Sequence, residues 1–150
     1  EFEDLIRIPS HLLLNLEVVR NDPIFRPIYD ETPELHDGLG GLAVYLIHES
    51  LNESSFWRPY LCSLPKFVPL PVFYSPQKRA ALYSQGLLSN RTGGRPYFDK
   101  LLRSIHWIID SKFSRIMPAL LRARPDLFSH AAYSKPRWAW AISIILSRTW

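Results

Sequence analysis

The strongest pattern along the chain is a stripe of apolar positions between residues 97 and 121. These positions recur every three or four residues through about seven helical turns, which predicts an amphipathic helix with one face on a core. They are Tyr97, Phe98, Leu101, Leu102, Ile105, Ile108, Ile109, Phe113, Ile116, Met117, Leu120 and Leu121. Pro118 lies within the stripe, and we expect the helix to kink or restart there because proline lacks a backbone donor.

Other apolar segments predict further helices. One stripe runs from Gly38 to about Asn52, and an apolar segment ending at Trp150 predicts a terminal helix that begins near Ser134 or Pro136. Residues 54–65 are expected to form a short helix with Ser54 or Ser55 as its N-cap. Ser75-Pro76 predicts another helix start, with serine as N-cap and proline at the first helical position.

The remaining segments before residue 38 are predicted to be non-helical. Leu5-Ile-Arg-Ile-Pro9 alternates in polarity and contains β-branched side chains, which predicts a short strand ended by proline. Residues 20–37 carry repeated Pro and Asp and are expected to be irregular. The predicted fold class is therefore mainly α with a short β segment, an α+β fold.

Composition fits one globular domain that is rich in aromatic residues. Hydrophobic residues make up 47% of the chain, which includes five Trp, seven Tyr and eight Phe. The net charge of +4 comes without a block of basic residues, so nucleic-acid binding is not indicated. No apolar run approaches the ~18 residues of a membrane span. Cys62 is the only cysteine, which excludes an internal disulfide and fits a reducing compartment.

Two motif-like segments are weak as ligand sites. The glycines of residues 38–43 match a dinucleotide fingerprint, but that motif requires a preceding buried strand, and residues 31–37 are polar and broken by proline. These glycines are expected to allow a tight entry into the helix. His48-Glu49 lacks the second histidine of a zinc motif, because position 52 is Asn52. We therefore expect no metal site, and a solvated or capping role for His48.

Two further features leave their interpretation open. Phe56, Trp57 and Tyr60 are either core packing, which their spacing favours, or a ligand platform. Arg148 is the one charge near the end of the apolar terminal helix. It either reaches water at a helix end whose dipole favours a cation, or pairs with an anion. The residues alone favour neither interpretation of Arg148.

Three segments occur in an order that is typical of one enzyme family. They are Leu42-Ala-Val-Tyr-Leu-Ile-His-Glu49, Ser55-Phe-Trp-Arg-Pro-Tyr-Leu-Cys-Ser-Leu-Pro65 and Trp140-Ala-Ile-Ser-Ile-Ile-Leu-Ser-Arg-Thr-Trp150. Together they resemble the SET-domain methyltransferases of the Rubisco large-subunit lysine methyltransferase class. In that class an aliphatic helix ending in Glu precedes S-F-W-x-P-Y-x-x-x-L-P, and W-A-x-S-x-x-x-S-R-x-F follows later. Residues 3–10 also look like a family strand of the form E-x-L-x-x-I-P.

The resemblance implies a domain organisation and one site residue. Residues 1–16 would be the tail of the SET β core, 17–37 a linker, 38–138 a helical SET insertion, and 139–150 a helix returning to that core. In the family, the Arg of the S-R-x-F segment lies at the cofactor and substrate site. Arg148 is therefore expected to bind the carboxylate of S-adenosylmethionine and to border the substrate. No catalytic residue is carried over.

The chain also departs from the family pattern. The family's G-x-G cofactor loop would precede Glu1, while its N-H segment and catalytic-site Tyr would follow Trp150. Trp150 itself replaces the usual Phe. We therefore expect an excised piece of a longer protein, with an incomplete catalytic core.

The functional expectation follows from this resemblance. The parent would be an S-adenosylmethionine-dependent N-methyltransferase acting on a protein lysine or histidine, and the chain alone would be inactive. Its expected partner is a protein substrate, with no nucleic acid and no membrane, and we expect an intracellular monomer in the cytoplasm, nucleus or a plastid. The alternative is a non-catalytic helical interaction module, which explains the aromatic residues and mild basicity without a cofactor.

Overall fold

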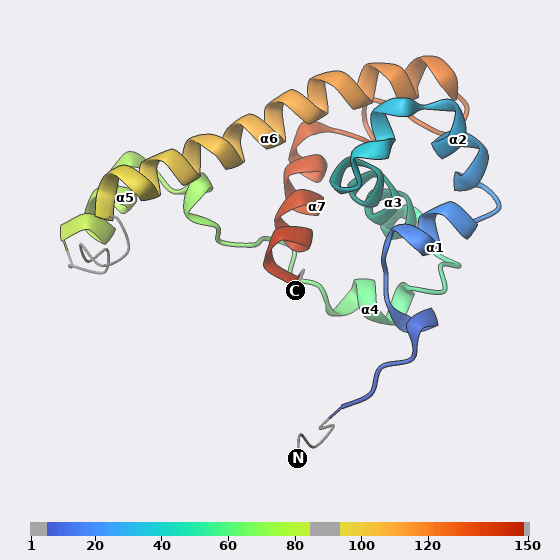
Figure 1. Ribbon diagram of the computed structural model, residues 1–150, viewed down its shortest axis with the longest axis horizontal. Helices are drawn as coiled ribbons and strands as arrows, with labels where there is room; N and C mark the ends of the chain where they lie inside the picture. Colours follow the sequence, from blue (N-terminus) through green and yellow to red (C-terminus); the bar gives the residue numbers. More distant parts are fainter. Residues whose placement is uncertain (1–5, 85–93, 149–150) are drawn as a thin grey trace.

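The computed structural model describes residues 6–84 and 94–148, and this part of the chain is built from helices (Figure 1). The α-helices are α1 (Leu16–Asn21), α2 (Phe25–Glu31), α3 (Leu39–Leu51), α4 (Arg58–Ser63), α5 (Pro76–Ser84), α6 (Gly94–Ala123) and α7 (Lys135–Arg148). Short 3-10 helices lie between them: η1 (Ser10–Leu12), η2 (Pro33–Asp37) and η3 (Pro71–Phe73).

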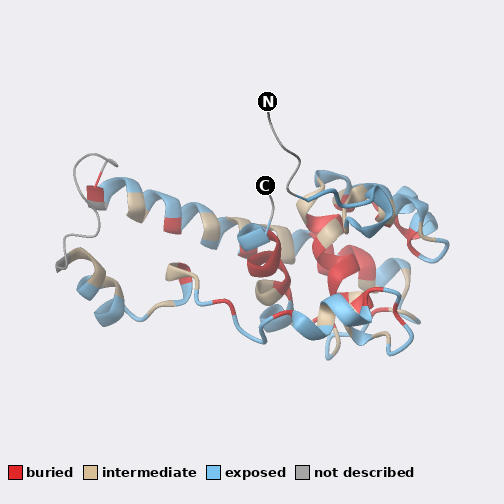
Figure 2. Ribbon diagram, turned by 90° about the horizontal axis from the view of Figure 1, so that it is seen from below, coloured by how far each residue is buried: buried red, intermediate tan, exposed pale blue. Residues whose placement is uncertain are grey.

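The core is built around α3 and α7. Helix α3 is buried along most of its length and packs against α7, η2 and α1. Figure 2 shows the buried residues gathered on these two helices. A helix that is apolar nearly all round must be covered by neighbours on every side. The rest of this body is therefore arranged around α3, with the fully buried Trp138 of α7 among the largest core side chains.

Helix α6 crosses this body and then extends beyond it with α5 as an arm (Figures 1 and 2). The second half of α6 reaches the core through Ile116 and Leu120, which are fully buried. The indole Nε1–H of Trp138 donates to the carbonyl oxygen of Ile109 at 2.9 Å and so ties α7 to α6. No helix of the described residues is long and apolar enough to cross a bilayer.

An ion-pair cluster fixes the entry to α3. The carboxylate of Asp37 accepts the Gly40 backbone N–H at 2.7 Å and so caps the first turn of α3. The same carboxylate pairs with Lys112 and with Arg115, at 2.9 Å for the latter, both on α6. One side chain thus joins η2, α3 and α6.

The predicted strand is wrong. Residues 6–9 form no strand, and none is found in residues 6–84 or 94–148, while Leu5 lies outside the described residues. The fold is mainly α without the β segment. Alternating polarity alone does not make a strand, because a strand needs a neighbouring strand for its backbone hydrogen bonds. Ile6 and Ile8 instead remain exposed.

The irregular conformation expected for residues 20–37 is also wrong, since α1 ends there and α2 and η2 follow. Pro27 lies in the first turn of α2, and Pro33 at the start of η2, where no internal donor is lost. Asp22 accepts the backbone N–H groups of Ile24 and Phe25, both at 2.9 Å. These prolines and this aspartate therefore begin short helices and do not interrupt them.

The other helix predictions have mixed outcomes. The ranges of α3, α6 and α7 agree with the predicted helices, and Ser75 caps α5 by accepting the Lys78 N–H at 3.2 Å. However, α6 does not restart at Pro118, because it continues to Ala123. Helix α4 begins at Arg58, later than predicted, and its N-cap is Trp57 with no side-chain cap. The serine at position 55 is used elsewhere, in a buried contact.

The glycines at the start of α3 serve packing. Gly38 has φ +80°, a left-handed conformation that glycine adopts readily. A Cβ at Gly41 would lie 2.8 Å from the backbone oxygen of Leu35 and 3.2 Å from Cε2 of Tyr29. The element before α3 is the 3-10 helix η2, so the strand of a dinucleotide site is absent at this position. The prediction of a tight entry into the helix is confirmed.

Replacing Gly41 with alanine should destabilise the chain. At an unconstrained helix position, Gly→Ala stabilises by roughly 0.5–1 kcal/mol. Here the added Cβ meets backbone that cannot move aside, and overpacking of this kind costs about 1–3 kcal/mol. Urea unfolding of Gly41→Ala followed by circular dichroism should therefore show a lower unfolding free energy. A stabilised variant would contradict the close approach to Leu35.

Candidate functional site

A cleft of about 800 Å³ opens among the described residues. It lies between residues 12–15, α3, residues 56–60 and the C-terminal half of α7. Its lining residues are mainly apolar or aromatic: Leu12, Leu13, Leu14, Asn15, Leu42, Leu46, Phe56, Trp57, Pro59, Tyr60, Ile144, Ile145 and Arg148. This size and character are typical of a small-molecule site, in which few polar groups orient a ligand.

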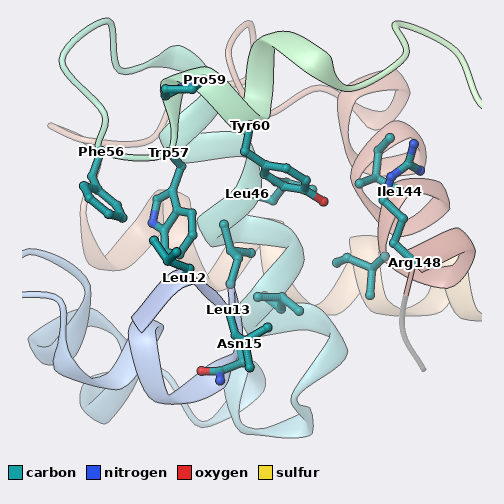
Figure 3. Close-up of a pocket in the computed structure, with 13 residues that line it drawn as sticks. Leu12, Leu13, Asn15, Leu46, Phe56, Trp57, Pro59, Tyr60, Ile144 and Arg148 are labelled. Carbon is teal, nitrogen blue, oxygen red and sulfur yellow. The ribbon is translucent and has the colours of Figure 1, made fainter. Parts of the chain in front are cut away.

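The aromatic cluster forms one wall of the cleft. Figure 3 shows Phe56, Trp57 and Tyr60 reaching toward the cavity from one side. Trp57 is 7% exposed, whereas Phe56 is 67% and Tyr60 39% exposed. Trp57 therefore belongs to the core, while Phe56 and Tyr60 are exposed side chains that line the cleft. Core packing is confirmed for Trp57, while a ligand platform at Phe56 and Tyr60 remains a prediction.

Arg148 lies across the same cleft, on the last turn of α7 beside Ile144 (Figure 3). It is the one ionisable cation among the lining residues. Its Nη1 donates to the Ser147 hydroxyl at 2.7 Å, and no carboxylate of the described residues pairs with it. An exposed guanidinium at the edge of an apolar cleft can hold an anionic group of a ligand. A binding role for Arg148 remains a prediction.

A buried carboxylate positions the aromatic wall. Glu49 on α3 is 6% exposed and accepts a hydrogen bond from the hydroxyl of Ser55. The Ser55 Oγ in turn accepts the backbone N–H of Trp57 at 3.0 Å. Ser55 is 7% exposed, so both bonds are shielded from water. This chain of contacts ties the segment after α3, and with it Trp57, to the core helix.

Other polar groups of α3 form a second polar network, which is part-buried. Nδ1 of His48 lies 3.1 Å from the Tyr133 hydroxyl. The imidazole ring of His48 packs edge-on against the ring of Phe25, with the two ring centroids 5.0 Å apart. The hydroxyl of Tyr45 donates to the carboxylate of Asp22 at 3.2 Å. His48 is half-buried and held by these contacts, so it is only partly solvated and its ring is not a cap, which differs from the prediction. Tertiary packing of α3 brings it against Tyr133 of the segment before α7.

Burial changes the acid–base properties of these side chains. Burial lowers the pKa of His48, although the neighbouring charges of Glu49 and Asp22 oppose this shift. Burial raises the pKa of Tyr45 and of Tyr133, and the Glu49 carboxylate adds to both shifts. All three groups are therefore held in their neutral forms at neutral pH. The network supports the fold and does not face the cleft through any of these three groups.

Part of the cleft was not predicted from sequence. Leu12, Leu13 and Asn15 close one side, although they lie in a segment that gave no site signal. Asn15 is the N-cap of α1, where its Oδ1 accepts the N–H groups of Glu17 at 2.9 Å and Val18 at 3.2 Å. The sequence feature that could have indicated this wall is a capping asparagine directly after three consecutive leucines. It indicates a chain turn that leaves those leucines free to face another element.

The chain is similar in sequence to enzymes that modify other proteins. It is 29% identical over 97% of its length to [fructose-bisphosphate aldolase]-lysine N-methyltransferase, chloroplastic, of Arabidopsis thaliana. It is 32% identical over 51% of its length to actin-histidine N-methyltransferase of Dasypus novemcinctus. Its relatives are protein methyltransferases. The chain spans only 27% and 13% of these two relatives, respectively. No protein-family model and no solved structure matches it.

Removing the Ser55 hydroxyl should loosen the aromatic wall. Ser55→Ala leaves the buried Glu49 without this donor, and an unsatisfied buried group costs about 1–3 kcal/mol. We expect a loss of that size in the unfolding free energy and a red shift of tryptophan emission. Ser54→Ala is the matched control, because Ser54 is exposed and bonds only Asn52. Equal effects of the two variants would contradict the positioning role.

The stability of the chain should fall as the pH drops from 7 to 5. His48 has a lowered pKa in the fold, so the unfolded chain binds the proton more readily in this window. The contribution of neutral His48 to the unfolding free energy is therefore fully present above the ordinary histidine pKa and is lost as the pH falls below it. His48→Gln should show a smaller loss of unfolding free energy between pH 7 and 5. Identical pH profiles would show that His48 is not the group responsible.

Proposed function

We propose that the chain is the helical part of a SET-type methyltransferase that moves a methyl group from S-adenosylmethionine to a lysine or histidine of a protein. The observation that carries the proposal is the cleft, which combines aromatic and aliphatic walls with the guanidinium of Arg148. The similarity to protein-lysine and protein-histidine methyltransferases supports this assignment. The order of the S-F-W and S-R segments supports the SET class within it.

The lining residues fit S-adenosylmethionine as a ligand. The cleft volume of about 800 Å³ lies within the ~300–1,000 Å³ of small-molecule sites. The exposed rings of Phe56 and Tyr60 offer surfaces for an adenine. Arg148 would pair with the ligand's carboxylate, an interaction that guanidinium groups make with two parallel hydrogen bonds.

The residues of this chain would orient the reactants. When bound, S-adenosylmethionine supplies an activated methyl group. The apolar walls around Leu46 and Ile144 would exclude water from one side of the cleft, while Arg148 would set the direction in which the ligand lies. Methyl transfer gains most of its acceleration from alignment of donor and acceptor in a dry site. Such a role needs no acid or base from these walls.

The rest of the enzyme would complete the site. The chain spans 27% of the lysine methyltransferase, so we propose that the other walls of the cofactor and substrate pockets come from residues beyond these 150. In this proposal residues 1–16 belong to the SET core, 17–37 link it to the helical insertion of 38–138, and 139–150 return to it. The monomeric state and the location in cytoplasm, nucleus or plastid remain predictions.

Arg148→Gln should weaken cofactor binding. Titration of the ¹⁵N-labelled chain with S-adenosylmethionine should shift the indole signal of Trp57 and the Nε–H signal of Arg148. Loss of one charge-assisted hydrogen bond should weaken binding by about tenfold. The cofactor affinity of Arg148→Lys should lie between those of the unsubstituted chain and Arg148→Gln, because lysine keeps the positive charge but lacks the planar, two-pronged hydrogen-bonding geometry of the guanidinium. The exposed Arg122→Gln serves as a control and should leave binding unchanged. Absence of shifts at both cleft residues would overturn the cofactor assignment.

A methyl-transfer assay tests the need for the missing walls. With labelled cofactor and a protein acceptor, we expect no turnover from the 150 residues, because alignment requires the complete site. A longer chain that includes the flanking sequence should be active. Turnover by the 150 residues alone would contradict the incomplete site. An inactive longer chain that also fails to bind S-adenosylmethionine would leave the helical interaction module as the function.

A further inference from the structure

A second large cavity lies on the other side of α4. This groove of about 780 Å³ runs between α4, residues 64–66 and the N-terminal half of α7. Its lining residues are Ser50, Arg58, Leu61, Cys62, Leu64, Pro65, Lys66, Pro136, Arg137 and Trp140. Three of them, Arg58, Lys66 and Arg137, are exposed cations that come from three different parts of the chain, and no acidic residue lines the groove.

These three cations lack a partner of opposite charge. Four cations of the described residues, Lys112, Arg115, Arg124 and Lys135, pair with an aspartate, and other surface cations are unpaired as the three of the groove are. What sets these three apart is that they line one groove without an acidic residue. No carboxylate of the described residues forms an ion pair with Arg58, Lys66 or Arg137. The groove therefore presents positive charge that the fold itself leaves uncompensated.

The position of Arg137 is unfavourable for its own helix. It lies in the first turn of α7, which contains no acidic residue. The helix dipole favours negative charge at this end and opposes a cation. The side chain is nevertheless held, since its Nη1 donates to the carbonyl oxygen of Ala132 at 3.0 Å. The dipole of α7 thus gives no reason for a positive charge here, while the bond to Ala132 holds the guanidinium at the rim of the groove, where it can meet an external anion.

The floor of the groove is apolar and fixed. The indole Nε1–H of Trp140 donates to the carbonyl oxygen of Pro65 at 2.9 Å, which holds the segment after α4 against α7. Leu64 is buried, and Leu61 and Trp140 are half-buried. A ligand here would meet an apolar floor with cations at the rim. This pattern suits a chain that carries carboxylates on either side of an apolar side chain.

We propose that this groove binds an acidic segment of the protein substrate, with Asp or Glu residues flanking an apolar residue. The identity of the partner as substrate rests on the proposed function. Three separated cations match several carboxylates along an extended peptide better than one small anion. The net charge of +4 and the lack of a basic stripe do not favour a nucleic acid.

The groove and the cleft are linked through the same two helices. Helix α4 contributes Arg58 to the groove and Tyr60 to the cleft, while α7 contributes Trp140 to the groove and Arg148 to the cleft. A substrate held by its acidic segment would therefore keep a neighbouring segment close to the cleft. Such tethering raises the effective concentration of the target residue without adding contacts at the reacting atoms.

Peptide binding tests the groove directly. The probe is a fluorescein-labelled peptide of Glu and Asp residues around one Leu, and its isosteric Gln and Asn version is the neutral comparison. Fluorescence anisotropy should show binding of the acidic peptide only, weakening as salt is added. Arg58→Glu with Lys66→Glu should weaken binding by about tenfold or more. The charge-matched control is Lys100→Glu with Arg103→Glu on the exposed face of α6. This control should change the peptide affinity by less than about twofold.

The outcomes separate this proposal from its alternatives. Equal loss of peptide affinity in both double variants would overturn the groove as the binding site. Absence of peptide binding by the unsubstituted chain would overturn it as well. A single-stranded oligonucleotide of the same charge that binds as tightly as the peptide would also overturn it. The anisotropy measurement needs no cofactor. Peptide binding without S-adenosylmethionine binding would therefore support the groove as an acidic-peptide site and contradict the methyltransferase function. Binding of S-adenosylmethionine without peptide binding would support the methyltransferase function and contradict the groove as a peptide site.

Discussion

The structure depends on the burial of α3. This helix is apolar on nearly every side, and its surface can leave water only when other elements cover it completely. Two adjacent glycines let the backbone of η2 and the Ile116 side chain of α6 lie against its first turns, and α7 packs along it. The segments that enter and leave this packed centre are thereby brought together at its surface. The cleft lies where three of them meet.

Polar groups inside the core decide where those segments run. Glu49, Ser55 and the backbone of Trp57 form a chain of buried hydrogen bonds, and His48 meets the Tyr133 hydroxyl in a second, part-buried contact. Buried polar groups are costly when unpaired, so each bond selects one path of the chain over the alternatives. The aromatic wall of the cleft is the result of the first chain of bonds. The position of the segment before α7 is set in part by the second.

Helices α4 and α7 connect two cavities of different chemistry. The cleft is apolar with one cation, and the groove has an apolar floor with three cations. For an enzyme that acts on proteins, these would serve the two tasks of holding a small methyl donor and holding a large acceptor. The names of two relatives state that they modify a lysine of an aldolase and a histidine of actin, so those enzymes act on protein acceptors.

Local patterns in the sequence were sufficient to predict α3, α6 and α7, because apolar periodicity records which face of a helix is buried. The cap at Ser75 was predictable for the same reason, since it depends on neighbouring residues alone. The strand predicted at residues 5–9 was wrong, because a strand needs a pairing partner that only the fold can supply. The irregular conformation predicted for residues 20–37 was wrong, because its Pro and Asp residues begin helices here, although the same residue types also break them. The resemblance singled out Arg148 from its motif. Only the tertiary structure places Arg148 opposite Phe56 and Tyr60, and brings the cations of the groove together. A cavity is assembled from segments far apart in the chain, and sequence spacing carries no record of the distances between them.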